Sequence, residues 1–419
     1  MARVPSRHCF EGGPARRPTM SIADGEATRI LDYLLGERQS MVDLLRRLAL
    51  AESPSDDPAA VGPVLTTLVS ELQQTEMAVR RFRGRLSGGM VYARPRKSIE
   101  KRPRQLLVGH CDTVWPVGTV RTMPVHVDGD KLLGPGVFDM KGGLVQMVYA
   151  LRAVTALGLR PPADCVVVIN SDEEIGSPDS TSLIRRLARL ASRAFVLEPA
   201  FGPEGKLKTS RKASGSFEII VRGRAAHAGV NPDEGVSAIL EMSHQIQKLF
   251  ALNDAARGIT VNVGTIDGGL RSNVVAPEAR ASVDVRVWTW EAAVEVEAAI
   301  RALRPINPKT VIEVQGGIGQ PPMEPLPRNQ ALWRLAKEFG GRLGLDLEQA
   351  AVGGTSDGNT TSRYTATLDG LGPVGGGAHA AHEYALISQM VQRCALLVLL
   401  IMAPLSPAGP GRAASGGQS

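Results

Sequence analysis

The spacing of apolar residues along this chain follows one pattern up to about residue 208 and another from there to about residue 320. In the first part, short apolar runs alternate with longer segments in which apolar residues recur every three or four positions. The short runs predict buried strands, at residues 105–109, 165–170 and 194–197. The longer segments predict helices, at residues 40–51, 142–157 and 178–191. Strands that alternate with helices are typical of an α/β fold, so we expect a mixed, mostly parallel sheet covered by helices.

The second pattern is the polar–apolar alternation of half-buried antiparallel strands. It predicts a strand–helix–strand–strand–helix–strand unit, at residues 216–222, 235–252, 259–266, 279–288, 290–303 and 310–314. This order is that of a split, ferredoxin-like α+β domain. A proline-rich linker follows, then a helix at 330–343, glycine-rich loops and a final apolar helix that ends near residue 403. We therefore expect a small domain, residues 209–320, inserted into a larger one formed by residues 20–208 and 321–403.

Composition indicates the nature of the two ends of the chain and the charge of its surface. Residues 1–19 are rich in Pro, Gly and Arg, and residues 404–419 in Pro, Ala, Gly and Ser, so both are expected to be disordered tails. Met20 is then an alternative start of translation. The net charge is +6, but part of it lies in the N-terminal tail, so the body gives no case for a nucleic-acid partner.

The same composition also indicates the cellular compartment of the protein. The N-terminus has no apolar stretch of the kind a secretory signal needs, and the apolar run at 394–403 is too short to span a bilayer. The four cysteines show neither metal-binding nor disulfide-rich spacing, which fits a reducing compartment. We expect a cytoplasmic protein without a membrane partner.

Acidic residues and histidines recur in five short motifs near the ends of these strands. They are His110-Cys111-Asp112-Thr113, Gly136 to Gly143, Asp172-Glu173-Glu174, Leu197-Glu198-Pro199 and Gly377-Ala378-His379. Carboxylate oxygen and imidazole nitrogen together suit zinc or another first-row divalent ion. The five motifs in order predict the centre of a two-metal hydrolase.

Some roles within these motifs follow from spacing. His110 and Asp112 lie two residues apart, so on a strand they share a face, and Asp112 can orient a metal-bound His110. The two oxygens of Asp139 can bridge two cations, although this aspartate also resembles an ordinary helix N-cap. Of the adjacent Glu173 and Glu174, one can bind metal while the other acts as a base towards water.

The last motif leaves a choice of histidine. His379 follows three glycines that let backbone approach a crowded site, and His382 follows it by three residues. The residues alone do not decide which of the two histidines is the ligand.

The order of these motifs resembles that of the M20 family of zinc aminoacylases and carboxypeptidases, and the closest branch looks like the glutamate carboxypeptidase (carboxypeptidase G2-like) type. The resemblance extends from about residue 40 to residue 403. Further matches support it, at residues 52–55 (ESPS), 223–229 (GRAAHAG), 273, 284–286 (DVR) and 353–357 (GGTSD). The resemblance implies a zinc-exopeptidase-like α/β domain with an inserted, ferredoxin-like dimerisation domain.

The resemblance also implies roles for individual residues. His110, Asp139 and Glu198 would hold one zinc ion. Asp139, Glu174 and His379 would hold a second, with Asp139 shared and with Co²⁺ or Mn²⁺ as possible substitutes. Glu173 would be the general base and Asp112 would orient His110.

The small domain would form a homodimer and supply His227 to the partner's active site. Asn273 and Arg286 would bind the substrate's carboxylate, a role that suits arginine because its planar fork pairs with both oxygens.

The expected activity is a dinuclear zinc-dependent hydrolysis of an amide bond adjacent to a free carboxylate, in a small peptide or an N-acyl amino acid. Close relatives carry an arginine in the last strand of the small domain, whereas residues 314–317 here (VQGG) have no basic side chain. A glutamate specificity therefore does not follow. Two alternatives stay open: an N-acyl or N-carbamoyl amino-acid amidohydrolase, and a catalytically inactive relative that binds peptides.

Overall fold

The computed structural model describes residues 24–97 and 102–405 of the 419-residue chain. The two expected tails, apart from residues 404 and 405, and the alternative start at Met20 lie outside the described residues. Within these ranges, no helix combines the length and the apolar character that crossing a bilayer requires.

The larger part of the molecule is built on a six-stranded sheet with the order β1-β2-β6-β3-β7-β14. The four strands at its centre and one edge are parallel: β3 (Arg104–His110), β6 (Asp164–Asn170), β7 (Arg193–Val196) and β14 (Ala366–Leu368). At the other edge, β1 (Met77–Phe82) and β2 (Met90–Pro95) run antiparallel. The expected mixed, mostly parallel sheet is confirmed, whereas the sequence pattern had not revealed this antiparallel edge.

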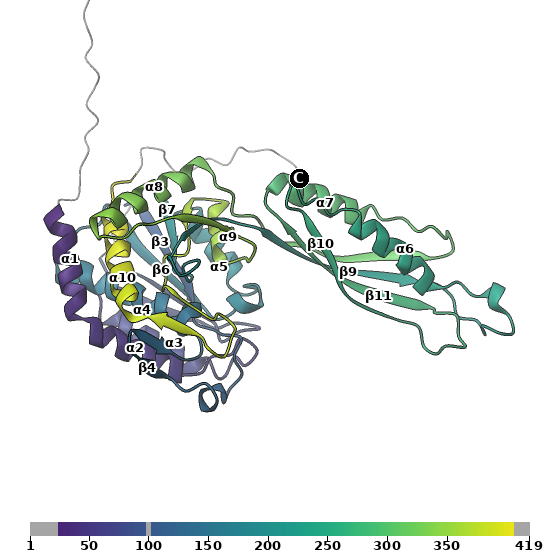
Figure 1. The fold of residues 1–419 in the computed structure, drawn as a ribbon, viewed down its shortest axis with the longest axis horizontal. Coiled ribbons are helices and arrows are strands. Elements are labelled where there is room, and N and C mark those ends of the chain that lie inside the picture. The colour runs from purple at the N-terminus through teal and green to yellow at the C-terminus, as the bar shows by residue number, and fades with distance from the viewer. Residues whose placement is uncertain (1–23, 98–101, 406–419) are drawn as a thin grey trace, which may run out of the picture.

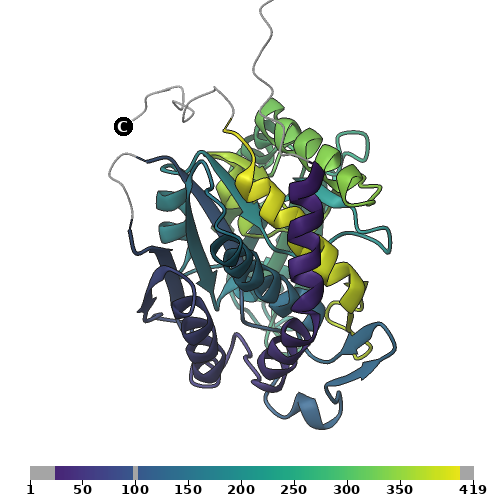
Figure 2. The same cartoon turned by 90° about the vertical axis from the view of Figure 1, so that its left-hand side faces the viewer.

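Helices cover both faces of this sheet, because its strands are apolar on both sides. On one face, Leu107, Val167 and Ile169 share a core with the helices α1 (Asp24–Gly36), α2 (Arg38–Leu50), α3 (Gly62–Gln73), α4 (Gly142–Ala156), α8 (Pro327–Arg342) and α10 (Ile387–Met402). On the other face, Val108 and Val168 pack against α5 (Thr181–Ala188). The short helix α9 (Asp357–Ser362) lies beside α5. Figure 2 shows α1 and α10 crossing each other on the first of these faces.

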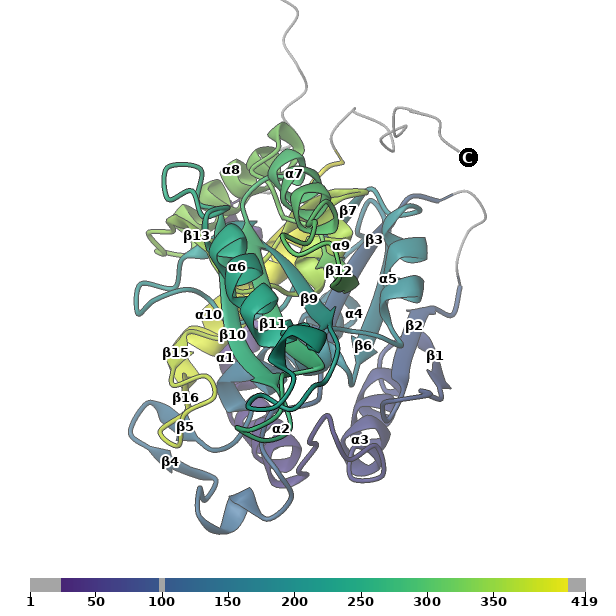
Figure 3. The same cartoon turned by 90° about the vertical axis from the view of Figure 1, so that its right-hand side faces the viewer.

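The second unit is a four-stranded antiparallel sheet that projects from the first (Figure 1). Its strands are β9 (Ala213–Arg222), β10 (Thr260–Gly268), β11 (Glu278–Val287) and β12 (Val311–Gln320), in the order β10-β11-β9-β12. The helices α6 (Ala238–Phe250) and α7 (Trp290–Arg301) share one core with the sheet and lie on one of its faces (Figure 3). This is the expected split α+β arrangement. Its buried positions alternate along β11, as the polar–apolar pattern predicts.

Several elements differ from their expected lengths. The helix expected over 235–252 covers Ala238–Phe250, and the strand expected over 216–222 begins at Ala213. The helix expected over 178–191 covers only Thr181–Ala188. It begins late because the Asp172 carboxylate accepts from the backbone N–H groups of Asp179 and Ser180 and holds a turn there. The strand expected over 310–314 extends to Gln320 and pairs with almost all of β9. Its second half contains three glycines, which hide the alternation that would have predicted it.

Two small sheets hold loops beside the centre of the molecule. In one, β8 (Leu207–Arg211) pairs with β13 (Gln349–Val352). In the other, the strands follow the order β15-β16-β5-β4, with bounds Gly375–Gly376, Tyr384–Leu386, Lys131–Leu133 and His126–Asp128.

Candidate metal centre

Strand ends and nearby loops bring the predicted site residues together at one edge of the large sheet. Ligand sites of open α/β sheets lie at the carboxyl ends of the parallel strands. β3 ends at His110, and Glu173, Glu174 and Glu198 follow β6 and β7. Asp139 precedes α4, which packs against β3.

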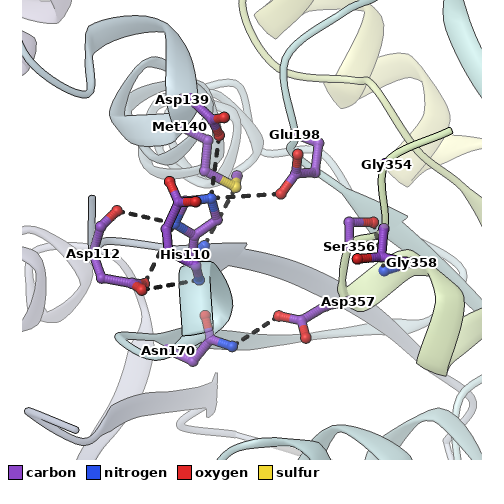
Figure 4. A network of polar contacts seen from close by, with 12 residues as sticks. His110, Asp112, Asp139, Met140, Asn170, Glu198, Gly354, Ser356, Asp357 and Gly358 are labelled. Atoms are coloured by element: carbon purple, nitrogen blue, oxygen red, sulfur yellow. Dashed lines mark hydrogen bonds and ion pairs between the residues drawn. The ribbon is translucent and has the colours of Figure 1, made fainter. Parts of the chain in front are cut away.

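One group of donors surrounds the His110 imidazole (Figure 4). Its Nε2 lies 3.3 Å from Oδ1 of Asp139 and 3.5 Å from Oε1 of Glu198. All three side chains are largely buried, with His110 only 1% exposed. A nitrogen and two carboxylate oxygens therefore converge on one point.

A second group surrounds the His379 imidazole. Its Nε2 lies 3.2 Å from Oε2 of Glu174 and 3.6 Å from Oδ2 of Asp139. The two oxygens of Asp139 thus face different histidines, as a carboxylate shared by two cations would require. His379 has a φ of 58°, a left-handed conformation that costs energy in a residue other than glycine and occurs mostly at functional sites. The structure brings His379 to this cluster, and no contact places His382 there within the described residues.

These distances fit a pair of tetrahedral metal sites. Two ligands that are each about 2.0–2.1 Å from a zinc ion lie roughly 3.3 Å from each other. One atom each of His110, Asp139 and Glu174, and one each of His110, Glu173 and Glu198, also lie within 4.8 Å of one another. The second set includes Glu173, so distance alone does not separate a ligand from a base at this position.

The electrostatics of the cluster also suit cations. Burial, followed by the charge of Asp139, raises the pKa of Glu198 to about 7. Burial and then the charge of Glu198 raise the pKa of Glu173 well above its usual range. Burial alone would lower the pKa of His110, but its contacts with Asp112 and Asp139 raise it well above 6.5. So many carboxylates in one buried place repel each other unless positive charge is bound between them.

Asp112 holds the other side of the His110 ring. Its backbone oxygen lies 3.1 Å from His110 Nδ1, and its Oδ1 lies 3.4 Å from the same nitrogen without an aligned hydrogen bond. Its Oδ2 accepts hydrogen bonds from the Ser55 hydroxyl and the Glu174 backbone N–H. Asp112 therefore lies where it can orient the imidazole and also connects to the second group.

Glu383 supports the loop that carries Asp139, a role that the motif pattern did not reveal. Its Oε1 accepts from the backbone N–H groups of Phe138 and Asp139. Its Oε2 accepts from the Gly136 N–H and the Trp115 indole. Glu383 is itself 1% exposed, so all four donors are satisfied by one buried carboxylate.

A buried basic pair behind Glu198 also escaped the sequence analysis. Arg211 donates to Oδ2 of Asp369 at 2.7 Å and lies 3.4 Å from Oε2 of Glu198. Lys208 is buried beside them, and burial lowers its pKa. The signal in the sequence is the polar run Lys208 to Arg211 inside a short strand that is buried at every position.

The metal cluster opens into a cavity of about 600 Å³. Asp139, Glu198 and Lys208 line it together with Phe201 and Tyr384, so it offers both charged and apolar walls. Its volume falls in the range that binds small molecules.

The three predicted substrate-binding residues lie outside this cluster, on the projecting unit. His227 and Asn273 are neighbours, since the Ala228 N–H donates to the Asn273 oxygen. They follow Arg222 and precede Glu278, which pair at the far end of β9 and β11. Arg286 pairs with Ser214 at the near end, where its guanidinium binds Asp284.

Comparisons with known proteins decide the family. The sequence pattern of peptidase family M20/M25/M40 matches residues 106–403. The chain belongs to this family. The carboxypeptidase G2 of Pseudomonas sp. (strain RS-16) is 28% identical to this M20 chain over 382 residues, which cover 87% of the chain and 89% of that protein. The resemblance inferred from the motif order is thereby confirmed, and the protein is an M20-type metallopeptidase.

Solved structures of peptidases share its fold. The aminopeptidase PepT from Bacillus cereus ATCC 10987 superposes with a TM-score of 0.70 at 19% identity, covering 87% of this chain and 98% of that chain. The Bacillus subtilis YXEP protein, described as a dinuclear metal binding peptidase from the M20 family, superposes with a TM-score of 0.64 at 13% identity, covering 88% and 98%.

Proposed function

We propose that this M20 metallopeptidase uses two zinc ions per chain to hydrolyse an amide bond adjacent to a free carboxylate. The observation that carries the proposal is the division of the Asp139 carboxylate between two histidines, with Oδ1 towards His110 and Oδ2 towards His379. His110, Asp139 and Glu198 would hold one ion, and Asp139, Glu174 and His379 the other. Bound there, the ions would polarise the scissile carbonyl and lower the pKa of a nearby water.

The chain's own residues supply the rest of the chemistry. Glu173 takes the proton of the attacking water and delivers it to the leaving amine nitrogen, without which the C–N bond would re-form. Its position beside the ligand Glu174 keeps it close to the reacting atoms. Asp112 orients the His110 ring, and Arg211 holds Glu198 through its second oxygen.

The substrate is a small peptide or an N-acyl amino acid. The cavity of about 600 Å³ has room for such a molecule, and Lys208 gives it a positive group. Arg286 and Asn273 would bind the free carboxylate. The relative named carboxypeptidase G2 supports the carboxypeptidase assignment. The amidohydrolase alternative differs only in the acyl group accepted.

The functional molecule is a homodimer. His227 and Asn273 lie beyond the far end of β9, and this ten-residue strand spans roughly 30 Å from its start beside the metal-binding domain. A residue at that distance reaches a metal centre more readily in a second chain than in its own. We also expect a cytoplasmic location, since the cysteines among the described residues are buried and unpaired.

Two substitutions test the proposed roles of the adjacent glutamates. Glu173→Gln keeps the shape and removes the base, so kcat should fall by about 10²–10⁴-fold while elemental analysis still finds two zinc ions. Glu174→Gln is the matched control, with the same change one residue away, and it should lose metal. Near-normal kcat in Glu173→Gln, or loss of zinc from it, would show that the two roles are assigned wrongly.

The substrate is tested separately. Zinc-loaded protein should release a free C-terminal amino acid from dipeptides or an amino acid from N-acyl derivatives, with products identified by mass spectrometry. Binding of these compounds without turnover by the metal-loaded protein would favour the inactive, peptide-binding alternative.

A further inference from the structure

Arg393 is a buried cation without a counter-ion among the described residues. It lies on α10 and is 1% exposed. Burial is the sole influence on its pKa, which falls to about 10, so no carboxylate among the described residues offsets its charge. An arginine remains protonated at neutral pH, and an unpaired buried charge is costly.

The hydrogen bonds of Arg393 leave much of its capacity unused. Its two terminal nitrogens donate to the backbone oxygens of Gly205 and Gly370, and its Nε has no partner in the described structure. A guanidinium has five N–H donors. Most of them therefore have no acceptor in the part of the chain that the structure describes.

The other two buried arginines, among the described residues, have partners for their charge or for their N–H groups. Arg211 is paired with the carboxylates of Asp369 and Glu198. Arg193 has no such pairing, but its nitrogens donate to the Gln105 side chain and to three backbone oxygens near the end of α10. Among the described residues, Arg393 has no carboxylate partner and only the two backbone acceptors of Gly205 and Gly370.

A cavity of about 270 Å³ lies against Arg393. Its walls come from residues 203–205, residues 344–347, Val374 and Gln389. Two acids, Glu204 and Asp346, also line it, but both are exposed to solvent, which screens them. The cavity has room for an ion with several waters, since a water occupies about 30 Å³ in the liquid.

We propose that this cavity is a binding site for a small monovalent anion, of the size of chloride, which pairs with the Arg393 guanidinium. The site is separate from the metal centre, but the two share a wall. Pro203 lines both cavities, and Gly205, which accepts from Arg393, continues the loop that faces the substrate cavity. A bound anion would therefore restrict the motion of the loop that forms one wall of the active site.

Thermal unfolding of the full, zinc-loaded chain tests this without any activity measurement. Chloride is titrated against gluconate, a much bulkier anion than chloride, at constant ionic strength. The wild type should gain about 2–4 °C in Tm with a saturable dependence on chloride. Arg393→Met should lose that dependence, whereas chloride bound to zinc would still act in this variant. An equal rise in both proteins, or none in the wild type, overturns the proposal.

A second variant covers the case in which Arg393→Met does not fold. Gln389 lies one helical turn before Arg393 and lines the same cavity, so Gln389→Glu places a carboxylate at the favoured i, i+4 spacing. It should raise Tm without chloride and remove most of the chloride response. Gln392→Glu, the same change on the same helix but outside the cavity lining, should keep the response. An undiminished response in Gln389→Glu would refute the site.

Discussion

At the scale of single residues, the metal centre depends on a carboxylate that binds no metal in the proposed site. Glu383 accepts four hydrogen bonds and so fixes residues 136–139, although it lies more than 240 positions away in sequence. Residue type, motif order and the family resemblance together were enough to predict His110, Asp139, Glu174, Glu198 and His379 as neighbours. They were not enough for Glu383 or Arg211, because these act through backbone groups and side chains that only the fold brings near.

Glu383→Gln should weaken metal binding. The amide replaces one acceptor oxygen by an NH₂ group that would face backbone N–H donors, and an unsatisfied buried donor costs about 1–3 kcal/mol. The Asp139 loop should then shift, and zinc affinity should fall by roughly 10–100-fold. Equilibrium dialysis against a zinc buffer measures this. Glu348→Gln, which alters an exposed partner of Lys206, serves as control and should bind zinc normally. Wild-type affinity in Glu383→Gln would contradict the positioning role.

At the scale of elements, the sequence predicted most of the helices and strands that carry the site, because their apolar periodicity is regular. It did less well where glycine interrupts the pattern, as in the second half of β12. The sequence alone also could not explain why α4 begins with two glycines. Gly143 lies against the end of β7, where a Cβ atom would come within 2.0 Å of the Leu197 oxygen. Close contact between helix and strand thus sets the distance between Asp139 and Glu198.

Gly143→Ala should therefore destabilise the protein, by about 1–3 kcal/mol, as overpacking in a rigid place does. It should also weaken zinc binding, because it displaces the strand end next to Glu198. The urea midpoint of the zinc-free protein and zinc dialysis measure the two effects. Gly341→Ala, near the end of α8 with open space around it, is the control and should be neutral or stabilising by up to about 1 kcal/mol. Similar behaviour of the two variants would remove the packing explanation.

At the scale of the whole molecule, the chain consists of a metal-binding body and a projecting α+β unit. The alternation of polar and apolar residues predicted that unit, including its split strand order, since each strand buries only one face. A single sequence could not show where its tip would point. In the described chain, His227 follows β9 and Asn273 precedes β11, beyond the strand ends at which Arg222 pairs with Glu278. If these residues act on substrate, each active site needs parts of two chains.

Mixing inactive chains tests this arrangement. His227→Ala lacks only the residue proposed to act in the partner's site, and Glu173→Ala lacks only the base of its own site. A hybrid dimer of the two then has one intact composite site and one doubly defective site. Random exchange of equal amounts makes half of the dimers hybrid, so activity should recover to about a quarter of the wild type.

Glu173→Ala mixed with Glu174→Gln is the matched control, because both defects lie in each chain's own site and no hybrid site is intact. Activity is assayed after subunit exchange has been demonstrated with differently labelled chains. Recovery in the first mixture alone supports a shared site, whereas equal activity in both mixtures would place His227 outside it.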